Sequence, residues 1–505
     1  MPSASDKTFL GFDFSTQQLK AVLVSDSLAD VLYVCSVQFD TDFPEFQTKD
    51  GVHRSIDGLV VTSPVELWLA ALDKVLEKMK GDDIDFSSIS ALSGAGQQHG
   101  SVYWKRGAKT MLAAMNPASS IRQQLKNAFS VPESPVWMDS STELQCQQLT
   151  LALGGPMRVA ELTGSKPYHR FTGVQIKKQL DTNKAAMDDT ERISLVSSMG
   201  ASLFLGDYAP IDYSDGSGMN LLNIRTRDWE ESCLAACGGA QLLRTLLAQP
   251  TPSNTNLGAI SPYFVKKYGF SSECAVIAFT GDNPASLAGI NQQRDDVAVS
   301  LGTSDTLFVW MTEHAPSLYY HVLCNPISQD HYMGMLCFKN GSLTRERVRR
   351  SLGCETWQAF NHLLSTTSAA NDGNIGFYFD SPEILPAISS GDWRAYADAL
   401  GYAPGKGRIL VTGGASSNAA ILQVLADVFQ SPVYTLESPN SAALGSAYRA
   451  KHGLLGTVPY EEICGEVPEP QLAARPNAAT AQAYAHLLTQ YKLREAELLC
   501  QSSSK

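Results

Sequence analysis

The sequence has 505 residues, of which 44% are hydrophobic and 18% charged, and its formal net charge at pH 7 is −12. A chain of this length exceeds one hydrophobic core, so two or three domains are expected. The acidic balance argues against a surface for nucleic acid or an anionic membrane, and no apolar run approaches the roughly 18 residues of a membrane-spanning helix. A local phosphate site is not excluded, because backbone amides and Mg²⁺ bind phosphate even in an acidic protein.

The amino terminus and the cysteines favour a cytoplasmic protein. The chain begins Met1-Pro-Ser-Ala and stays polar through Lys7, so no apolar segment of a signal peptide is evident. The ten cysteines are scattered, and the nearest pair, Cys233 and Cys237, lacks a second pair or a histidine partner at zinc-site spacing. Reduced thiols in the cytoplasm are therefore the expected state.

Two similar β-hairpins are predicted, one in each half of the chain. Residues 9–24 and 297–309 each read as an apolar run, a short turn of small polar residues, and a second apolar run. A duplicated supersecondary unit indicates a duplicated fold rather than a chance turn. Strand and helix patterns alternate along the rest of the chain, which is typical of α/β proteins.

The two predicted turns carry different chemistry. The first holds Asp13, Ser15 and Thr16, and the second holds Gly302, Thr303 and Ser304. A carboxylate can hold a hydrated Mg²⁺, while hydroxyls and backbone N–H groups can bind phosphate oxygens. Two such hairpins facing each other across a cleft would hold a nucleoside triphosphate.

A helix and a polar loop follow the first hairpin. Residues 63–66 (SPVE) match a capping box with proline at the first helical position, and apolar residues recur at helical spacing up to Gly81. A strand at 89–92 then leads into the glycine-rich loop 94–100. That loop is a loose match to a dinucleotide fingerprint without the later ribose-binding acid, and no P-loop motif occurs. His99 in this loop is either a satisfied core histidine or a ligand for a polyhydroxylated molecule.

Two further strands end in candidate functional turns. Residues 274–279 lead into Gly281-Asp282-Asn283-Pro284, where Asp282 is either a helix N-cap or a general base at the rim of a cleft. Residues 408–412 lead into Gly413-Gly414 and a helix over 419–429, and paired glycines let a flat purine lie against the backbone. Ligands of α/β folds lie at the carboxyl ends of strands. A terminal amphipathic helix is predicted over about 477–499, and the domain boundary near 292–296.

Together these motifs resemble the FGGY family of carbohydrate kinases over nearly the whole chain, with the kinases of eukaryotic xylulose metabolism as the nearest branch. The motifs that carry the resemblance are GFDFSTQQ (11–18), LSGAGQQHGS (92–101), VWMDSS (136–141), RISLVSS (192–198), IDYSDGSGMN (211–220), FTGDNPAS (279–286), SLGTSDT (300–306) and TGGASSN (412–418). The resemblance implies a two-domain actin-like ATPase (ribonuclease H-like) fold with a catalytic cleft between the domains. Residues 1–292 would bind the sugar and carry the first phosphate turn, and residues 293–505 would bind the nucleotide.

The resemblance also implies roles for individual residues. Asp282 would be the catalytic base, and Asp13 would organise Mg²⁺. The sugar-binding set would be His99, Arg170, Asp282 and Asn283. The set for ATP would be Ser15, Thr16, Lys20, Gly302, Thr303, Trp357, Gly413, Gly414 and Asn418. The reaction implied is ATP-dependent phosphorylation of D-xylulose to D-xylulose 5-phosphate. The expected partners are the sugar and ATP, with neither nucleic acid nor membrane involved, and the oligomeric state stays open.

One departure from the family pattern lies in the second half. The family has a strand and a long helix between the strand that here reads GFYF (376–379) and the adenosine turn, but this chain is shortened between about 380 and 408. One alternative within the family is a kinase for another ketose or polyol. The shortened segment adds a second alternative, a catalytically impaired sugar-binding variant.

Overall fold

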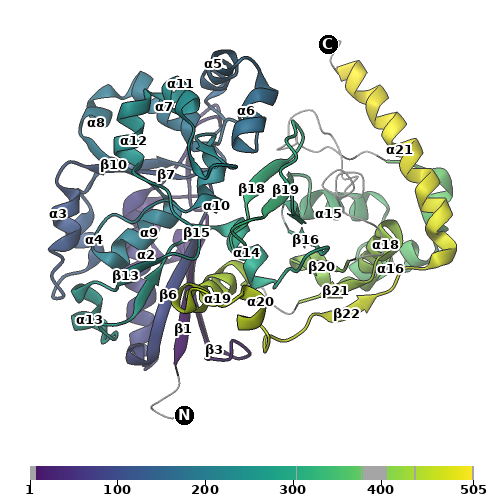
Figure 1. The fold of residues 1–505 in the computed structure, drawn as a ribbon. Coiled ribbons are helices and arrows are strands. Elements are labelled where there is room, and N and C mark those ends of the chain that lie inside the picture. Colours follow the sequence, from purple (N-terminus) through teal and green to yellow (C-terminus); the bar gives the residue numbers. More distant parts are fainter. Residues whose placement is uncertain (1–6, 303, 377, 379–406, 437–439, 503–505) are drawn as a thin grey trace.

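The computed structural model describes residues 7–302, 304–376, 378, 407–436 and 440–502. These form two α/β halves that are joined side by side, with the long carboxyl-terminal helix at the outer edge of the second half (Figure 1). No helix among the described residues is both long enough and apolar enough to span a bilayer. The shortened region between about 380 and 408 lies almost entirely outside the described residues.

The first half is built on a sheet that contains the amino-terminal hairpin. Strands β1 and β2 pair antiparallel from Phe9 opposite Val24 to Phe14 opposite Leu19, which confirms the first predicted hairpin. The strand order is β13-β14-β6-β1-β2-β3, and β15 pairs with the end of β6. The bounds are β1 Thr8–Phe14, β2 Gln18–Val24, β3 Val31–Gln38, β6 Ile89–Gly96, β13 Asn256–Ala259, β14 Ala275–Ile277 and β15 Thr280–Gly281.

The second half repeats this arrangement. Its sheet has the order β18-β19-β17-β16-β20-β21-β22, and β16 and β17 pair antiparallel, which confirms the second predicted hairpin. In each half the first hairpin strand also pairs in parallel with a later strand, β1 with β6 and β16 with β20. The bounds are β16 Val297–Leu301, β17 Asp305–Met311, β18 His321–Cys324, β19 Tyr332–Phe338, β20 Ile409–Thr412, β21 Val433–Thr435 and β22 Gln471–Ala474.

Smaller strands and many helices complete the chain. The other strands are β4 His53–Arg54, β5 Val61–Pro64, β7 Ser101–Lys105, β8 Phe129–Val131, β9 Glu133–Pro135, β10 Thr190–Leu195, β11 Leu222–Asn223 and β12 Asp228–Trp229. Helices of the first half are α1 Phe39–Asp42, α2 Val65–Gly81, α3 Ala108–Ala113, α4 Ile121–Leu125, α5 Glu143–Leu153, α6 Pro156–Thr163, α7 Thr172–Thr182, α8 Lys184–Asp188, α9 Val196–Leu205, α10 Tyr213–Gly216, α11 Glu231–Cys237, α12 Ala240–Leu247, α13 Pro262–Tyr268 and α14 Asp282–Gly289. Those of the second half are α15 Ser342–Ser351, α16 Trp357–Thr366, α18 Ala419–Phe429, α19 Ser441–Leu455, α20 Tyr460–Ile463 and α21 Ala481–Ser502.

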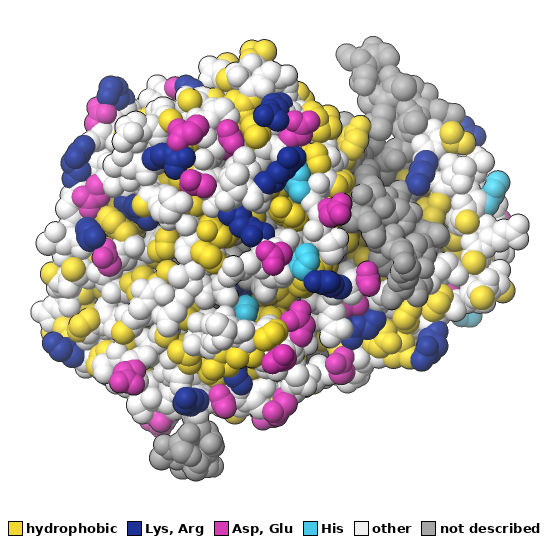
Figure 2. All heavy atoms as spheres, in the orientation of Figure 1, with side chains coloured by type: hydrophobic (Ala, Val, Ile, Leu, Met, Phe, Trp, Pro, Cys, Tyr) yellow, Lys and Arg dark blue, Asp and Glu magenta, His cyan; other side chains and the backbone are white. Residues whose placement is uncertain are grey.

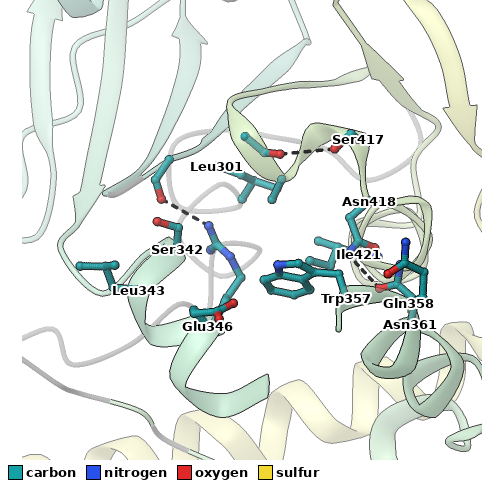
Figure 3. A pocket seen from close by; sticks show the side chains of 14 residues that line it. Leu301, Ser342, Leu343, Glu346, Trp357, Gln358, Asn361, Ser417, Asn418 and Ile421 are labelled. Carbon is teal, nitrogen blue, oxygen red and sulfur yellow. Dashed lines mark hydrogen bonds between the residues drawn. The ribbon is translucent and has the colours of Figure 1, made fainter. Parts of the chain in front are cut away.

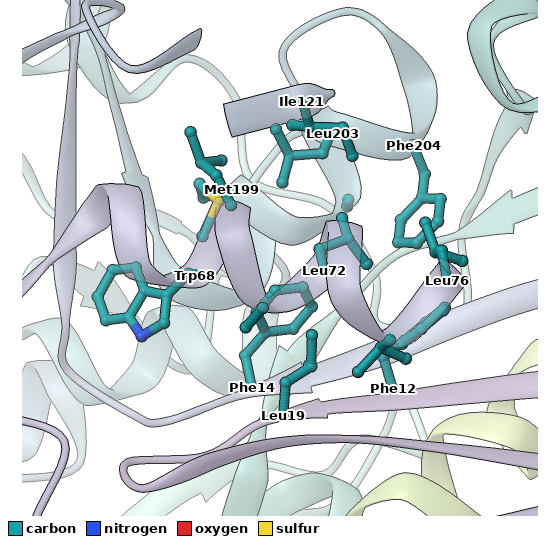
Figure 4. Close-up of a cluster of buried hydrophobic side chains, with 14 of the residues drawn as sticks. Phe12, Phe14, Leu19, Trp68, Leu72, Leu76, Ile121, Met199, Leu203 and Phe204 are labelled. Carbon is teal, nitrogen blue, oxygen red and sulfur yellow. The ribbon is translucent and has the colours of Figure 1, made fainter. Parts of the chain in front are cut away.

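The core of the first half lies between its sheet and helices α2 and α9. Phe12 and Phe14 of β1 pack there with Trp68 and Leu72 of α2 and with Phe204 of α9 (Figure 4). These large side chains have almost no solvent exposure, and burying each such side chain contributes about 1.5–3 kcal/mol. The turn that holds Asp13 and Ser15 is therefore carried by a rigid strand.

The predicted capping box at residues 63–66 is wrong, although the helix that follows it is confirmed. Ser63 and Pro64 belong to β5, which pairs with β9, and α2 begins at Val65. The Ser63 hydroxyl donates to the Gly51 carbonyl oxygen at 3.0 Å, so it is not available to a helix terminus. The sheet pairing of β5 outweighs the local capping signal, since it satisfies the backbone groups of the same residues.

The surface carries no concentrated basic patch on the face shown in Figure 2, where Lys and Arg side chains alternate with Asp and Glu. Nine of the ten cysteines are identified as free thiols in the structure.

Helices α14 and α19 cross in unusually close contact where the two halves meet. A Cβ atom added at Gly445 of α19 would lie 1.8 Å from the Ala285 carbonyl oxygen of α14, and one added at Gly289 of α14 would lie 1.9 Å from the Ser441 carbonyl oxygen. Since these contacts are to backbone atoms, the helices could accept a methyl group only by moving apart.

We expect Gly445→Ala to lower the free energy of unfolding by about 1–3 kcal/mol, the usual cost of overpacking a core. Gly81→Ala is the matched control, because a Cβ there meets nothing within 4 Å and alanine favours helix by up to about 1 kcal/mol. Urea unfolding would measure both variants. A Gly445→Ala protein as stable as the parent chain would show that this crossing tolerates separation.

Candidate active site

The first turn places a buried carboxylate at the end of β1. Asp13 is 5% exposed, and its Oδ2 accepts a hydrogen bond of 2.5 Å from the Ser15 hydroxyl. Its Oδ1 is buried without a hydrogen-bond partner. Burial raises the pKa of Asp13 above its ordinary value, although Ser15 and the charge of Lys20 oppose that rise. An unpaired carboxylate oxygen of this kind suits a hydrated Mg²⁺.

The other residues predicted to bind phosphate near this turn are Lys20 and Thr16, and they differ in how free they are to bind a ligand. Lys20 lies directly opposite Asp13 in the β1–β2 register. The Thr16 hydroxyl accepts a hydrogen bond of 2.9 Å from Trp137 Nε1 and lies 3.4 Å from Gln97 Oε1. Thr16 thus already serves the local structure, and only its remaining lone pair could serve a ligand.

Asp282 is the first residue of α14, immediately after β15. The N-cap residue of α14 is Gly281, and Asp282 Oδ1 accepts a hydrogen bond of 2.8 Å from the Asn283 backbone N–H. The Asn283 amide also donates to Gln98 Oε1 at 2.9 Å. Burial and the charge of Asp13 together raise the pKa of Asp282 to about 7. Asp282 is therefore no ordinary N-cap, and its pKa suits a base that works near neutral pH.

His99 and Arg170 lie together in a cluster of aromatic rings. His99 Nδ1 lies 2.8 Å from the Gly218 carbonyl oxygen, which can only accept, so Nδ1 carries the proton. Burial and the charge of Arg170 lower the pKa of His99 well below its ordinary value, so the ring is neutral and its Nε2 is an acceptor. The guanidinium of Arg170 lies over the rings of Tyr168 and Trp137, at 4.8 and 5.6 Å from their centroids. His99 thus offers an acceptor, and Arg170 offers donors, to a hydroxylated ligand.

The nucleotide residues predicted in the second half line a separate pocket of about 750 Å³. Gly302, Trp357, Gly414 and Asn418 are among its lining residues, and Figure 3 labels Trp357 and Asn418. Its volume is in the range of sites for small organic molecules. Gly413 directly precedes the lining residue Gly414 and has a φ of 87°, a backbone conformation that favours glycine. Thr303 lies outside the described residues.

Asn418 has a structural function that the sequence did not reveal. Its side-chain oxygen accepts from the Ile421 N–H at the start of α18, and its amide donates to Asn361 Oδ1 of α16 at 2.8 Å. It therefore fixes the helix α16 that carries Trp357 against the turn that carries Gly414.

Two residues without an assigned role also belong to these sites. Arg345 lines the same pocket as Trp357, forms a bidentate ion pair with buried Asp305, and lies 3.4 Å from the Gly302 carbonyl oxygen. Asp215 is buried close to Gln98 and Gly281, and burial with the charge of Asp212 raises its pKa well above the ordinary value. Asp215 lies within one of the family motifs, but Arg345 had no local signal.

No group of three or more His, Cys, Asp or Glu side chains among the described residues could hold a metal ion. A metal bound here would be held by Asp13 alone or with a neighbouring oxygen, and would keep most of its water, as Mg²⁺ does.

The matching strand orders, the pocket on one half and the buried carboxylates on the other fit a small-molecule kinase of the actin-like ATPase fold. The chain belongs to the FGGY family of carbohydrate kinases: the model of the family's N-terminal domain matches residues 8–289, and that of the C-terminal domain matches residues 394–454. It is 51% identical to the xylulose kinase of Rattus norvegicus, over 98% of each chain. It is 50% identical to the xylulose kinase of Mus musculus, over 98% of this chain and 95% of that one. A crystal structure of xylulose kinase from Rhodospirillum rubrum shares the fold, with a TM-score of 0.81 at 16% identity over 97% of this chain and 99% of that chain.

The raised pKa of Asp282 predicts a pH-dependent cost in stability. Its pKa is about 7 when folded and near 3.8 when unfolded, so the folded state binds an extra proton between these values. Stability from this group is therefore lost as pH rises from about 4 to 7. We expect the free energy of unfolding of Asp282→Asn, relative to that of the parent chain, to increase by about 1–2 kcal/mol when the pH is raised from 5 to 8. This range includes a discount for solvent screening.

The measurement is urea unfolding at both pH values without Mg²⁺. Asp57→Asn is the control, because Asp57 is exposed and the Ser55 hydroxyl lowers its pKa, so its contribution is constant over this range. An Asp282→Asn difference that does not change with pH would show that this carboxyl titrates normally.

Proposed function

We propose that this chain transfers the γ-phosphoryl group of ATP to D-xylulose and releases D-xylulose 5-phosphate and ADP. The observation that carries the proposal is Asp282, a carboxylate with a pKa of about 7 that lies next to the metal-competent Asp13. The names of the rat and mouse relatives support the choice of sugar, since about half of all residues are identical over nearly the full chain.

In the proposed reaction Asp282 takes the proton of the sugar 5-hydroxyl while that oxygen forms a bond to the γ-phosphorus. The bond from the γ-phosphorus to the bridging oxygen breaks, and ADP leaves with the electron pair. His99 Nε2, Arg170 and Asn283 orient the sugar, and such positioning is most of what phosphoryl transfer requires. Asp13 would hold Mg²⁺, which supplies charge neutralisation for the phosphates.

The nucleotide would occupy the pocket in the second half. Trp357 would line one face of the adenine, and the Gly413–Gly414 turn the other, with Asn418 between them. Gly302 and Thr303, together with Ser15, Thr16 and Lys20, would face the phosphates. We therefore propose 1–292 as the sugar-binding domain and 293–505 as the nucleotide-binding domain, in a cytoplasmic enzyme, which the free thiols support.

A panel of pentuloses, hexuloses and polyols with Mg-ATP, followed by ADP release, tests the function. We expect D-xylulose to have the highest kcat/KM, and Asp282→Asn to lower turnover by about 10²–10⁴, the usual contribution of a general base. Sugar affinity, measured by titration calorimetry, should change little because Asn is isosteric. Preference for another acceptor would overturn the substrate, and full turnover by Asp282→Asn would overturn the role of the base.

A specific observation also favours the alternative of an impaired, sugar-binding variant. The alignment with the rat relative spans 527 positions but only 98% of this chain, so about 30 positions have no counterpart here. In the second half, helix α16 has no buried residue at all, and Leu363 and Leu352 remain about half exposed. Exposure of these side chains is what the loss of a covering element would leave.

We therefore predict that the chain binds sugar weakly and turns over ATP poorly, because losing several buried contacts would remove much of a typical domain's roughly 5–15 kcal/mol of stability. Inserting a family-length segment between Gly391 and Arg408 should restore turnover and raise the unfolding temperature of the second half. A Gly/Ser insertion of equal length is the control. Vigorous phosphorylation and one cooperative unfolding transition in the unmodified chain would show that the segment is dispensable.

A further inference from the structure

Strand β18 of the second half lies directly against the loop of the first half that carries Arg170. The Val322 N–H donates to the Gly164 carbonyl oxygen at 2.9 Å. A Cβ atom at Gly164 would lie 1.9 Å from the Val322 carbonyl oxygen, and Gly164 has a φ of 82°. Only glycine fits this close approach, so loop and strand form one packed unit.

His321 is the first residue of β18 and is inserted into the aromatic cluster of the sugar site. Its side chain is 4% exposed, and its Nδ1 lies 3.0 Å from the Ser165 hydroxyl. Its ring lies 5.2 Å from Phe171 and 6.0 Å from Tyr168, measured between ring centroids. Phe171 in turn stacks on His99 at 4.5 Å, and Tyr168 lies under the guanidinium of Arg170.

His321 thus touches both aromatic residues that support the two proposed sugar ligands. Burial and the nearby positive charges of Arg170 and Lys166 lower its pKa to about 3, so the ring is neutral at physiological pH. A neutral ring can pack against Phe171 without adding a charge beside Arg170. Two further hydrogen bonds hold β18 against the first half. Ser217 Oγ accepts from the Cys324 N–H at 3.0 Å, and Ser214 Oγ donates to the Cys324 carbonyl oxygen.

We propose that His321 is a positioning residue for the sugar site: it holds the 164–171 loop so that Arg170 and His99 face the same ligand. The second half of the chain therefore completes the sugar site of the first. The strand that carries His321 pairs with β19, and β19 pairs with β17, next to the second phosphate turn. This inference rests on the proposed function, which assigns Arg170 and His99 to the sugar.

Three variants separate the contributions of the side chain. His321→Phe keeps a ring against Phe171 but loses the hydrogen bond to Ser165, His321→Asn keeps a polar group near Ser165 but loses the ring, and His321→Ala loses both. Because His321→Ala removes both the hydrogen bond and the aromatic contact, we expect it to weaken D-xylulose binding by about tenfold or more, and the other two variants to weaken it by less. ATP affinity should stay within about twofold.

The control is His331→Ala, which removes a histidine at the other end of the β18–β19 hairpin, where the ring faces Trp310 and Ser328 instead. Sugar and ATP affinities would be measured by titration calorimetry. Hydrogen exchange of residues 164–172, measured without ligand, gives a readout that does not depend on the identity of the sugar. We expect these residues to exchange faster in His321→Ala than in the parent chain, and at the parent rate in His331→Ala.

Unchanged exchange in residues 164–172, or faster exchange with unchanged sugar affinity, would overturn the positioning role. Equal losses of sugar and ATP affinity would also overturn it, because they indicate general destabilisation. A parent chain that binds another ketose or polyol instead of D-xylulose would refute the proposed substrate alone, and the variants would then be compared with that ligand. If it binds none of them, the exchange measurement still decides whether His321 holds the loop.

Discussion

The contact between α14 and α19 is the constraint on which the arrangement of the site depends. Gly289 and Gly445 bring the two helix backbones together, and Gly11 lets α19 approach β1 equally closely, since a Cβ there would lie 1.9 Å from the Ala443 carbonyl oxygen. Helix α14 begins with Asp282 and β1 ends beside Asp13. One helix of the second half therefore fixes both carboxylates relative to each other. The buried side chain of Arg449 on the same helix reinforces this contact, because it donates to the Ala278 carbonyl oxygen just before β15.

This rigidity allows the site to hold groups that are unfavourable in isolation. Asp13, Asp282 and Asp215 all lie where burial raises their pKa values, and His99 has a φ of 69°, which non-glycine residues rarely adopt. Each of these features costs stability, and such costs persist only where the surrounding structure fixes the conformation. Here the large core around Phe12, Trp68 and Phe204 supplies that support. The first half can thus carry a strained site with buried carboxylates without losing its fold.

The sequence predicted the elements that depend on local patterns. Predictions failed where the structure depends on contacts between residues far apart in the sequence. Both hairpins and the helix over 419–429 were predicted correctly, because apolar alternation, glycines and helical spacing are local signals. The predicted capping box at Ser63 was wrong because β5, which contains Ser63, pairs with β9, about 70 residues later in the sequence. Resemblance to a family supplied Arg170 and Trp357, for which no local pattern exists. Neither route indicated Arg345 or His321, since an ion pair with Asp305 and a ring packed on Phe171 become visible only in three dimensions.

Helices α2 and α16 differ in how much of their surface the protein buries. Ten residues of α2 are buried against strands β2 and β3 and helix α4, whereas α16, which contacts α18, has no buried residue. The wall that α16 and its Trp357 provide is instead held by polar contacts such as the one between Asn418 and Asn361. A nucleotide bound in this pocket would cover apolar surface that the chain itself leaves exposed, and a ligand that binds only the folded state stabilises it in proportion to its occupancy. If nucleotide binds in this pocket as proposed, its binding would stabilise the second half, and a change in the covering of α16 would alter both the stability and the affinity.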